Sequence, residues 1–457
     1  MFKTGDKMND KQELFELPIK KAILKFVGPC VLSQVVTMIH SLADTFFVGQ
    51  TGDPNQVAGL SLCFPIYMIM TAVANLFGIG ANSSISRFLG AQQPKRAKNV
   101  SSFALWVSVI VIAVISAVLL IFMRPILTAV GASSATYEHA SGYVLWVVVI
   151  GGIPTVAEMV LANMMRAEGM AKAASTGLML GGFVNIVLDP IFISVFDMGA
   201  LGAGIATFIA NLAALLYLLF CLWKTRETTV LSLNPKDMGV SGAVAKNILL
   251  VGLPAFLVVI LGCTANMVLN HFMTSYGDVN MAAFGIVQKV GNLTVQIVVG
   301  IATGIMPLLG YHYAAGNPRK VREICKLSFV IVGVFTAACL VLYELFAKYL
   351  IMVFIDDAET VRIGADFLRR WILCAPGMCF CQVFNAIFQG LGFWKQSTAL
   401  SFVRQGVVLI PMLVILEHII GMYGLVFAAP VADTTALILG FILYARVAAK
   451  TLKTQEV

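Results

Sequence analysis

The chain has 457 residues, of which 59% are hydrophobic and 12% are charged, and its formal net charge at pH 7 is +8. Ordinary globular proteins carry roughly 25% charged residues, so this little polar material could not cover soluble domains, which excludes a soluble enzyme, a disordered chain and a secreted disulfide scaffold. Despite the positive charge we expect no nucleic-acid partner, because the basic residues lie between apolar runs instead of on one solvated face. We expect most of the protein surface to be in contact with membrane lipid.

Residues 1–18 are polar and lack the apolar stretch of a signal peptide, so we expect them to form a cytoplasmic tail. Beyond them, apolar runs of about 20 residues recur, each long enough to cross a bilayer as an α-helix. They predict twelve transmembrane helices, at residues 19–48, 56–86, 100–123, 138–165, 171–193, 201–223, 247–273, 281–310, 326–347, 368–389, 396–416 and 422–446.

Most of the 31 Lys and Arg residues fall in alternate connections between these spans. Cytoplasmic loops are enriched in Lys and Arg, so these connections and both termini are predicted to lie in the cytoplasm. We expect an N-lobe at residues 19–223, a cytoplasmic linker at 224–246, a C-lobe at 247–446 and a cytoplasmic C-terminal tail at 447–457.

The two halves repeat each other at a separation of about 223 residues. The clearest pair is the loop Ala91–Arg96, after the second predicted span, and the loop Ala315–Lys320, after the eighth. Six helices return the chain to its starting side, so this all-α polytopic membrane protein should form two parallel six-helix lobes, with pseudo-twofold symmetry along the membrane normal. Such lobes can enclose a cleft that opens to each side in turn. A channel, a receptor or an assembly scaffold is the alternative.

Ionisable residues inside the spans are candidates for function, because a charge at mid-bilayer costs at least about 2.5–3.5 kcal/mol on insertion scales. The acids within or near the ends of predicted spans are Asp44, Glu158, Asp189 and Asp433, and the cations are Lys289 and Arg404.

Two of the acids belong to a candidate ion site in the first half. Asn185 and Asp189 are four residues apart and so share one helix face, and Thr207 lies in the next predicted span. With Asp44 they supply carboxylate, amide and hydroxyl oxygens, which suit a small hard cation such as sodium, or a proton shared between desolvated acids. In the alternative, Asp44 and Asp189 cap helix ends at the membrane surface, which the Asp189-Pro190 sequence would favour.

Other residues are candidates for a substrate cleft. Lys289 lies centrally in its span, and Asp433 is its expected counter-charge from the same half. Glu158 could take part in coupling, or could be satisfied by Asn163 or neighbouring backbone as a packing residue. Both interpretations stay open.

Two further spans carry residues of interest for other reasons. Arg404 is expected to reach the cytoplasmic interface near Lys395, and we assign it no function. Pro29, in the first span, removes a backbone donor and permits a bend that could swing the segment carrying Asp44.

Several segments resemble the multidrug and toxic compound extrusion (MATE) family. They are Asp44–Gly49, Ser86–Ala91, Arg166–Gly169, Asn185–Pro190, Gly202–Thr207, Ala314–Asn317 and Gln389–Gly392. The resemblance implies a twelve-helix exporter of amphipathic, often cationic compounds that is driven by sodium ions or protons. In its DinF-like branch the coupling ion is associated with positions that match Asp44, Asn185, Asp189 and Thr207 here. The NorM-like branch uses acids in the seventh and tenth helices, whose apolar stretches here contain none.

We therefore expect a secondary active multidrug antiporter in a bacterial inner membrane, acting as a monomer, with H+ or Na+ as coupling ion and no cofactor. A flippase for a lipid-linked precursor is the main alternative, and it would need a basic cavity for pyrophosphate. No HExxH, GxSxG or GxxxxGK[ST] motif indicates an enzyme.

Overall fold

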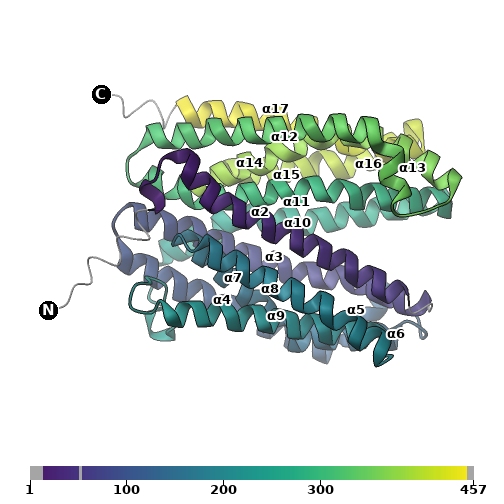
Figure 1. Ribbon diagram of the computed structural model, residues 1–457, viewed down its shortest axis with the longest axis horizontal. Coiled ribbons are helices and arrows are strands. Elements are labelled where there is room, and N and C mark those ends of the chain that lie inside the picture. Colours follow the sequence, from purple (N-terminus) through teal and green to yellow (C-terminus); the bar gives the residue numbers. More distant parts are fainter. Residues whose placement is uncertain (1–13, 51–53, 450–457) are drawn as a thin grey trace.

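The computed structural model describes residues 14–50 and 54–449, and every regular element within these ranges is a helix (Figure 1). The first half contains α2 (Ile19–Gly49), α3 (Pro54–Gly90), α4 (Pro94–Ile121), α5 (Met123–Val130), α6 (Tyr137–Val144), η1 (Leu145–Ile150), α7 (Gly152–Ala167), α8 (Ala171–Asp189), η2 (Pro190–Val195) and α9 (Gly199–Lys224). The second half contains η3 (Pro235–Asp237), α10 (Gly242–Thr274), α11 (Asp278–Ala314), α12 (Pro318–Met352), α13 (Ala358–Trp371), η4 (Ile372–Cys374), α14 (Ala375–Leu391), α15 (Trp394–Phe402), η5 (Val403–Leu409), α16 (Ile410–Ile420) and α17 (Met422–Val447).

Eleven helical stretches of the described residues are long and apolar enough to cross a membrane, and a bent pair, residues 137–150 and 152–167, brings the total to as many as twelve. The pair bends by 49° around Gly151, where a π-helical turn precedes α7. All twelve predicted spans therefore have a helical counterpart, and the predicted all-α membrane fold is confirmed.

The tenth span begins earlier than expected. Its helical stretch starts at Ala358, whereas the sequence predicts a start near residue 368. The additional turns form α13, an amphipathic helix whose charges made it resemble a loop. Asp366 and Arg370 pair along it at 3.0 Å, and the Arg370 guanidinium lies over the Tyr423 ring of α17.

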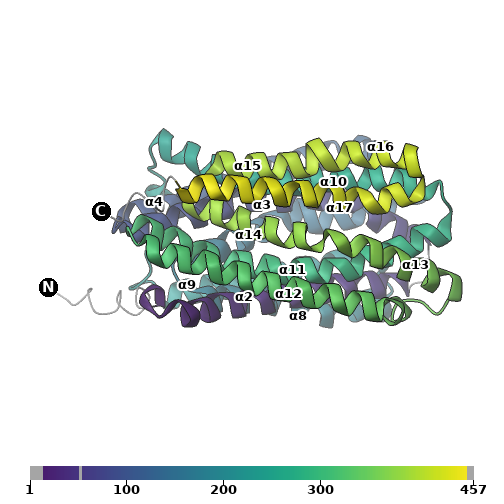
Figure 2. The ribbon, with the colours of Figure 1, turned by 90° about the horizontal axis from the view of Figure 1, so that it is seen from above.

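The two lobes meet along four helices, α2 and α3 of the N-lobe and α10 and α11 of the C-lobe. Figure 1 shows α2 running obliquely between the two groups of helices, and Figure 2 shows that both groups lie along the same long axis. Helix α3 packs against α10 so closely that a Cβ atom on Gly252 would lie 1.8 Å from the Leu76 carbonyl oxygen. The lobes also touch near the end that carries both termini, where the Ser83 hydroxyl of α3 donates to the Gln389 carbonyl at 2.5 Å.

Gly252→Ala is expected to destabilise the protein by about 1–3 kcal/mol, because the added methyl would push α10 away from α3. Gly285→Ala is the matched control in α11, where nothing lies within 4 Å of an added Cβ, and it should be neutral or slightly stabilising. Thermal unfolding in detergent compares the two variants. Equal melting temperatures would contradict the close approach of the lobes.

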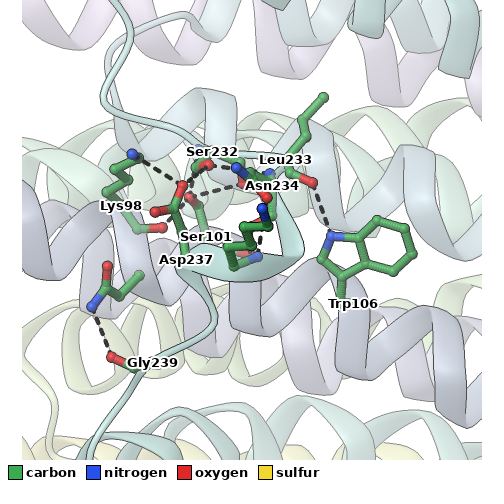
Figure 3. A network of polar contacts seen from close by, with 11 residues as sticks. Lys98, Ser101, Trp106, Ser232, Leu233, Asn234, Asp237 and Gly239 are labelled. Atoms are coloured by element: carbon green, nitrogen blue, oxygen red, sulfur yellow. Dashed lines mark hydrogen bonds and ion pairs between the residues drawn. The ribbon is translucent and has the colours of Figure 1, made fainter.

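The connection between the lobes, residues 225–241, is held against α4 by polar contacts (Figure 3). Asp237 is central to them: its Oδ2 accepts a hydrogen bond from the Ser232 hydroxyl at 2.5 Å and lies 3.0 Å from Lys98 Nζ. These two groups hold the pKa of Asp237 below its usual range. The remaining contacts join Ser101 Oγ to Ser232 N (2.9 Å), Ser102 Oγ to the Asn234 carbonyl (2.6 Å), Trp106 Nε1 to the Leu233 carbonyl (2.9 Å) and Asn99 Nδ2 to the Gly239 carbonyl (2.7 Å).

Asp237→Asn is expected to increase amide hydrogen exchange of Ser232 and Asn234 at neutral pH, because the ion pair with Lys98 is lost. A lowered folded-state pKa contributes stability above the ordinary carboxyl pKa, and that stability is lost only as pH falls through the lowered value. In the unsubstituted protein the protection should therefore stay constant from about pH 5 to pH 8, after correction for intrinsic exchange. Unchanged exchange in the variant would show that Asp237 does not hold the linker.

Candidate ion and substrate site

The structure brings the four predicted ion-site residues together between α2, α8 and α9. Asn185 and Asp189 of α8 are fully buried, and Thr207 of α9 is nearly so. Asn185 Nδ2 donates to Thr207 Oγ1 at 3.5 Å, and the Thr207 hydroxyl donates to the Ala203 carbonyl at 2.9 Å. The side chain of Asp44, on α2, interacts with both Asp189 and Asn185.

These residues present buried oxygen atoms that receive no hydrogen bond. They are Asp44 Oδ1, both carboxylate oxygens of Asp189 and the amide oxygen of Asn185. Leaving such acceptors unsatisfied away from water is costly, so the cluster suits a ligand that supplies positive charge. A small hard cation or a proton fits two carboxylates and an amide. The described residues hold no group of three His, Cys, Asp or Glu side chains with metal-site geometry.

The alternative, in which Asp44 and Asp189 cap helix ends, does not hold. Helix α2 continues past Asp44 to Gly49, and the chain remains helical through Pro190 into η2. The Asp189 side chain makes no capping hydrogen bond. Both carboxylates therefore belong to the interior of the N-lobe.

Sequence reasoning missed His40, one turn before Asp44 on α2. Its Nε2 lies 3.4 Å from Asp44 Oδ2. The spacing of four residues could have indicated this contact, because residues i and i+4 of a helix are neighbours. Tyr67 of α3 and Tyr143 of α6 also lie near the acids, Tyr67 beside Asp44 and Glu158 and Tyr143 beside Asp44 and Asp189.

Glu158 lies in the same lobe, on α7, and is only 7% exposed. Its Oε2 has no hydrogen-bond partner. The suggestion that Asn163 satisfies Glu158 is wrong, because Asn163 Nδ2 donates to the Met159 carbonyl at 2.9 Å and its Oδ1 accepts from Arg166 at 3.5 Å. The local helix geometry thus occupies Asn163 on both sides, and no described residue donates to Glu158 Oε2.

The expected pairing of Lys289 with Asp433 is also wrong. Asp433 of α17 accepts a hydrogen bond from Arg404 Nε of η5, and both side chains are largely buried. Lys289 lies on α11, which packs within the C-lobe against α12, α13 and α14. Lys289 is exposed and forms no ion pair within the described ranges. Because Arg404 is paired with the buried Asp433, it does not extend to the cytoplasmic interface as expected.

Pro29 lies within a continuous α2. The face of α2 opposite Pro29 meets the C-lobe, since Cβ atoms on Gly304 and Gly300 of α11 would lie 2.7 and 2.6 Å from the Cα atoms of Val27 and Val31. The proline removes one backbone hydrogen bond from this stretch. Any bend at Pro29 would thus change the contact between the lobes.

Two membrane-spanning lobes, with unsatisfied carboxylates buried in one of them, are the architecture of a membrane transporter. The MatE family profile matches residues 29–191 and 254–415, one segment in each lobe. The chain belongs to this family, and the resemblance to MATE transporters is confirmed.

The chain is 28% identical over 431 residues to the multidrug export protein MepA of Staphylococcus aureus, covering 93% of this chain and 94% of MepA. An outward-facing multidrug resistance MATE family transporter of the MOP superfamily is 27% identical with a TM-score of 0.89, covering 96% of this chain and 98% of that one. A MOP superfamily transporter from Pyrococcus furiosus, described as having a binding pocket of reversed polarity that suggests a different function, is 27% identical with a TM-score of 0.89 and covers 99% and 100%. These homologues are transporters and not enzymes, and the chain is a transporter of the MATE family.

Proposed function

We propose that this protein is an antiporter that couples inward movement of protons or sodium ions to the export of amphipathic, often cationic compounds. The observation that carries the proposal is the cluster of buried oxygens on Asp44, Asp189 and Asn185 that no donor satisfies. Because positive charge is missing there, an ion taken from one side of the membrane would stabilise the cluster, and its release on the other side would restore it.

The position of α2 supports a route from the ion site to the lobes. Helix α2 carries Asp44 on its contact with α8, and it packs against α11 of the opposite lobe around Pro29. A change in charge at Asp44 would alter the packing of a helix that belongs to both contacts. Ion and substrate would then favour opposite openings of the cleft, each by its differential affinity for the two arrangements.

The driving force is sufficient for useful export. One elementary charge that crosses 100 mV releases about 2.3 kcal/mol, which sustains roughly a fiftyfold gradient of a neutral substrate. A chemical gradient of the same ion would add to this.

The interior charges favour cationic substrates over a pyrophosphate-linked lipid. Asp44, Asp189 and Glu158 place acids in the N-lobe without a paired lysine or arginine among the described side chains, whereas the buried Arg404 is already paired with Asp433. A flippase for a lipid-linked precursor would need the reverse balance. We further assign the protein to the DinF-like branch, as a monomer in a bacterial inner membrane with both termini cytoplasmic. The N-lobe, linker and C-lobe boundaries are those predicted from the sequence.

Ethidium transport into vesicles that contain the purified protein tests the proposal. A pH gradient and a sodium gradient are imposed separately, and empty vesicles serve as the control. The proposal predicts ethidium accumulation against its gradient with at least one of them. Transport that only equilibrates ethidium under both gradients would overturn it.

A further inference from the structure

Polar side chains on three neighbouring helices lie in order across the N-lobe, from α8 through α9 to α7. Asn185 of α8 donates to Thr207 of α9 at 3.5 Å. Asn211 follows Thr207 by one helical turn and so lies on the same face of α9. Its Nδ2 donates to Thr155 Oγ1 of α7 at 2.7 Å.

The series ends at Glu158. Thr155 and Glu158 are three residues apart on α7, so their side chains are neighbours on one helix face. Both are buried, with exposures of 1% and 7%. Polar side chains of α7 and α9 therefore line the way from Glu158 towards the Asp44 and Asp189 site, and Tyr67 of α3 interacts electrostatically with both Glu158 and Asp44.

Among the described residues, Glu158 has no counter-charge in an ion pair. Besides Glu158, the ionisable residues on α7 and on the helices packed against it are Cys63, Tyr67 and Arg87 of α3, Lys95, Arg96 and Lys98 of α4, Arg166 of α7, Lys172 and Asp189 of α8, Tyr217, Cys221 and Lys224 of α9, and Asp278, Lys289, Tyr311, His312 and Tyr313 of α11. Within the described part of the chain, none of the cations among them forms an ion pair with Glu158. A charged carboxylate in this position is strongly unfavourable whenever water is excluded.

A single monovalent ion at the Asp44 and Asp189 site does not neutralise Glu158 as well as these two acids. The basic side chain of His40 contacts Asp44, 3.4 Å from its Oδ2. Glu158 thus needs a positive charge of its own when the cleft is closed to water. Its Oε2, buried and without a donor, can accept a proton directly.

We propose that Glu158 is a second proton-binding carboxyl group of the N-lobe, joined to the Asp44 and Asp189 site through Thr155, Asn211 and Thr207. This inference rests on the proposed antiport function and extends it. The Glu158 carboxylate takes a proton from water on one side, forms an O–H bond, and loses that proton to water on the other side. Each cycle then imports two cations, one at each site.

The stoichiometry gives a clear electrical signature with a monovalent cationic substrate such as ethidium. Two cations that enter against one that leaves move one net positive charge inward. In Glu158→Gln, one cation enters for each that leaves, and no net charge moves. An imposed potential of about 100 mV should therefore shift the steady ethidium gradient about fiftyfold in the unsubstituted protein and leave it unchanged in Glu158→Gln.

Three controls make the comparison decisive. Glu158→Asp keeps a carboxyl group and should keep the response to potential. Glu138→Gln removes an exposed acid of α6 and should behave as the unsubstituted protein. Infrared difference spectra on ethidium addition should show that the carbonyl band of a protonated carboxyl group is lost. This change should not occur in Glu158→Gln, and its measurement does not require transport.

The outcomes separate the two proposals. A response to potential that persists in Glu158→Gln, or that is missing from the unsubstituted protein while an ion gradient still drives transport, overturns the second carboxyl site alone. Transport that no ion gradient drives overturns the antiport function itself. If Glu158→Gln does not fold, a Glu158→Asp variant with an unchanged infrared band position and no response to potential would contradict the second site.

Discussion

Asp44→Asn and Asp189→Asn are each expected to abolish accumulation of ethidium against its gradient. The amide side chain cannot take up a proton and provides a weaker ligand for sodium, so the oxygen cluster between α2 and α8 no longer exchanges an ion. We expect the ethidium gradient to fall from about fiftyfold, the value that one net inward charge per cycle sustains at 100 mV, to none. Efflux from cells with and without a protonophore measures the change.

The control for this pair is Asp197→Asn. Asp197 follows η2 in an exposed, left-handed conformation that asparagine adopts readily, so this variant should export at the unsubstituted rate. Equal protein levels in the membrane exclude loss through misfolding. If Asp44→Asn and Asp189→Asn both exported as well as Asp197→Asn does, these acids would have no part in ion coupling.

Breaking the buried pair of the C-lobe is expected to have the largest effect on stability. Asp433→Asn leaves the Arg404 guanidinium without its partner, and Arg404→Met leaves the Asp433 carboxylate, which is 2% exposed, without its partner. Removal of one member of a buried ion pair destabilises a protein by about 3–5 kcal/mol, because the remaining charge is uncompensated. Denaturant unfolding in detergent should show a loss of this size for each single variant.

The double variant Arg404→Met with Asp433→Leu should recover most of the loss, since apolar groups of similar volume can replace a buried ion pair at little cost. Arg369→Gln is the matched control, because Arg369 and Glu344 form an exposed pair at 3.7 Å whose loss should cost at most about 1 kcal/mol. A double variant as unstable as the single ones would mean that the pair stabilises the C-lobe by geometry that apolar packing cannot replace.

Much of the fold followed from the sequence because lipid imposes simple rules on a spanning chain. Runs of apolar residues must become helices, and basic residues mark the connections. The same rules failed at α13, where Arg362, Asp366 and Arg370 suggested a loop although their spacing of four residues suits a helix face. The bend at Gly151 was invisible too, since it depends on a π-helical turn.

The candidate ion site was predictable to a similar extent. The spacing of Asn185 and Asp189 places them on one face, and His40 could have been found by the same rule from Asp44. The partner of Asp433 could not, because it depends on which helices are neighbours. Helix α14 lies against both α11 and α17, and η5 turns Arg404 towards α17. The unsatisfied oxygen of Glu158 likewise required the bonds of Asn163 to be known.

Binding of ethidium to the purified protein, titrated at several pH values and sodium concentrations, tests the central claim most directly. If the N-lobe carboxylates exchange an ion against the substrate, ethidium affinity must fall as the coupling ion rises, and ion affinity must fall by the same factor when ethidium is bound. The account predicts this reciprocal effect in the unsubstituted protein and its loss in Asp189→Asn. An ethidium affinity that neither protons nor sodium change would contradict it.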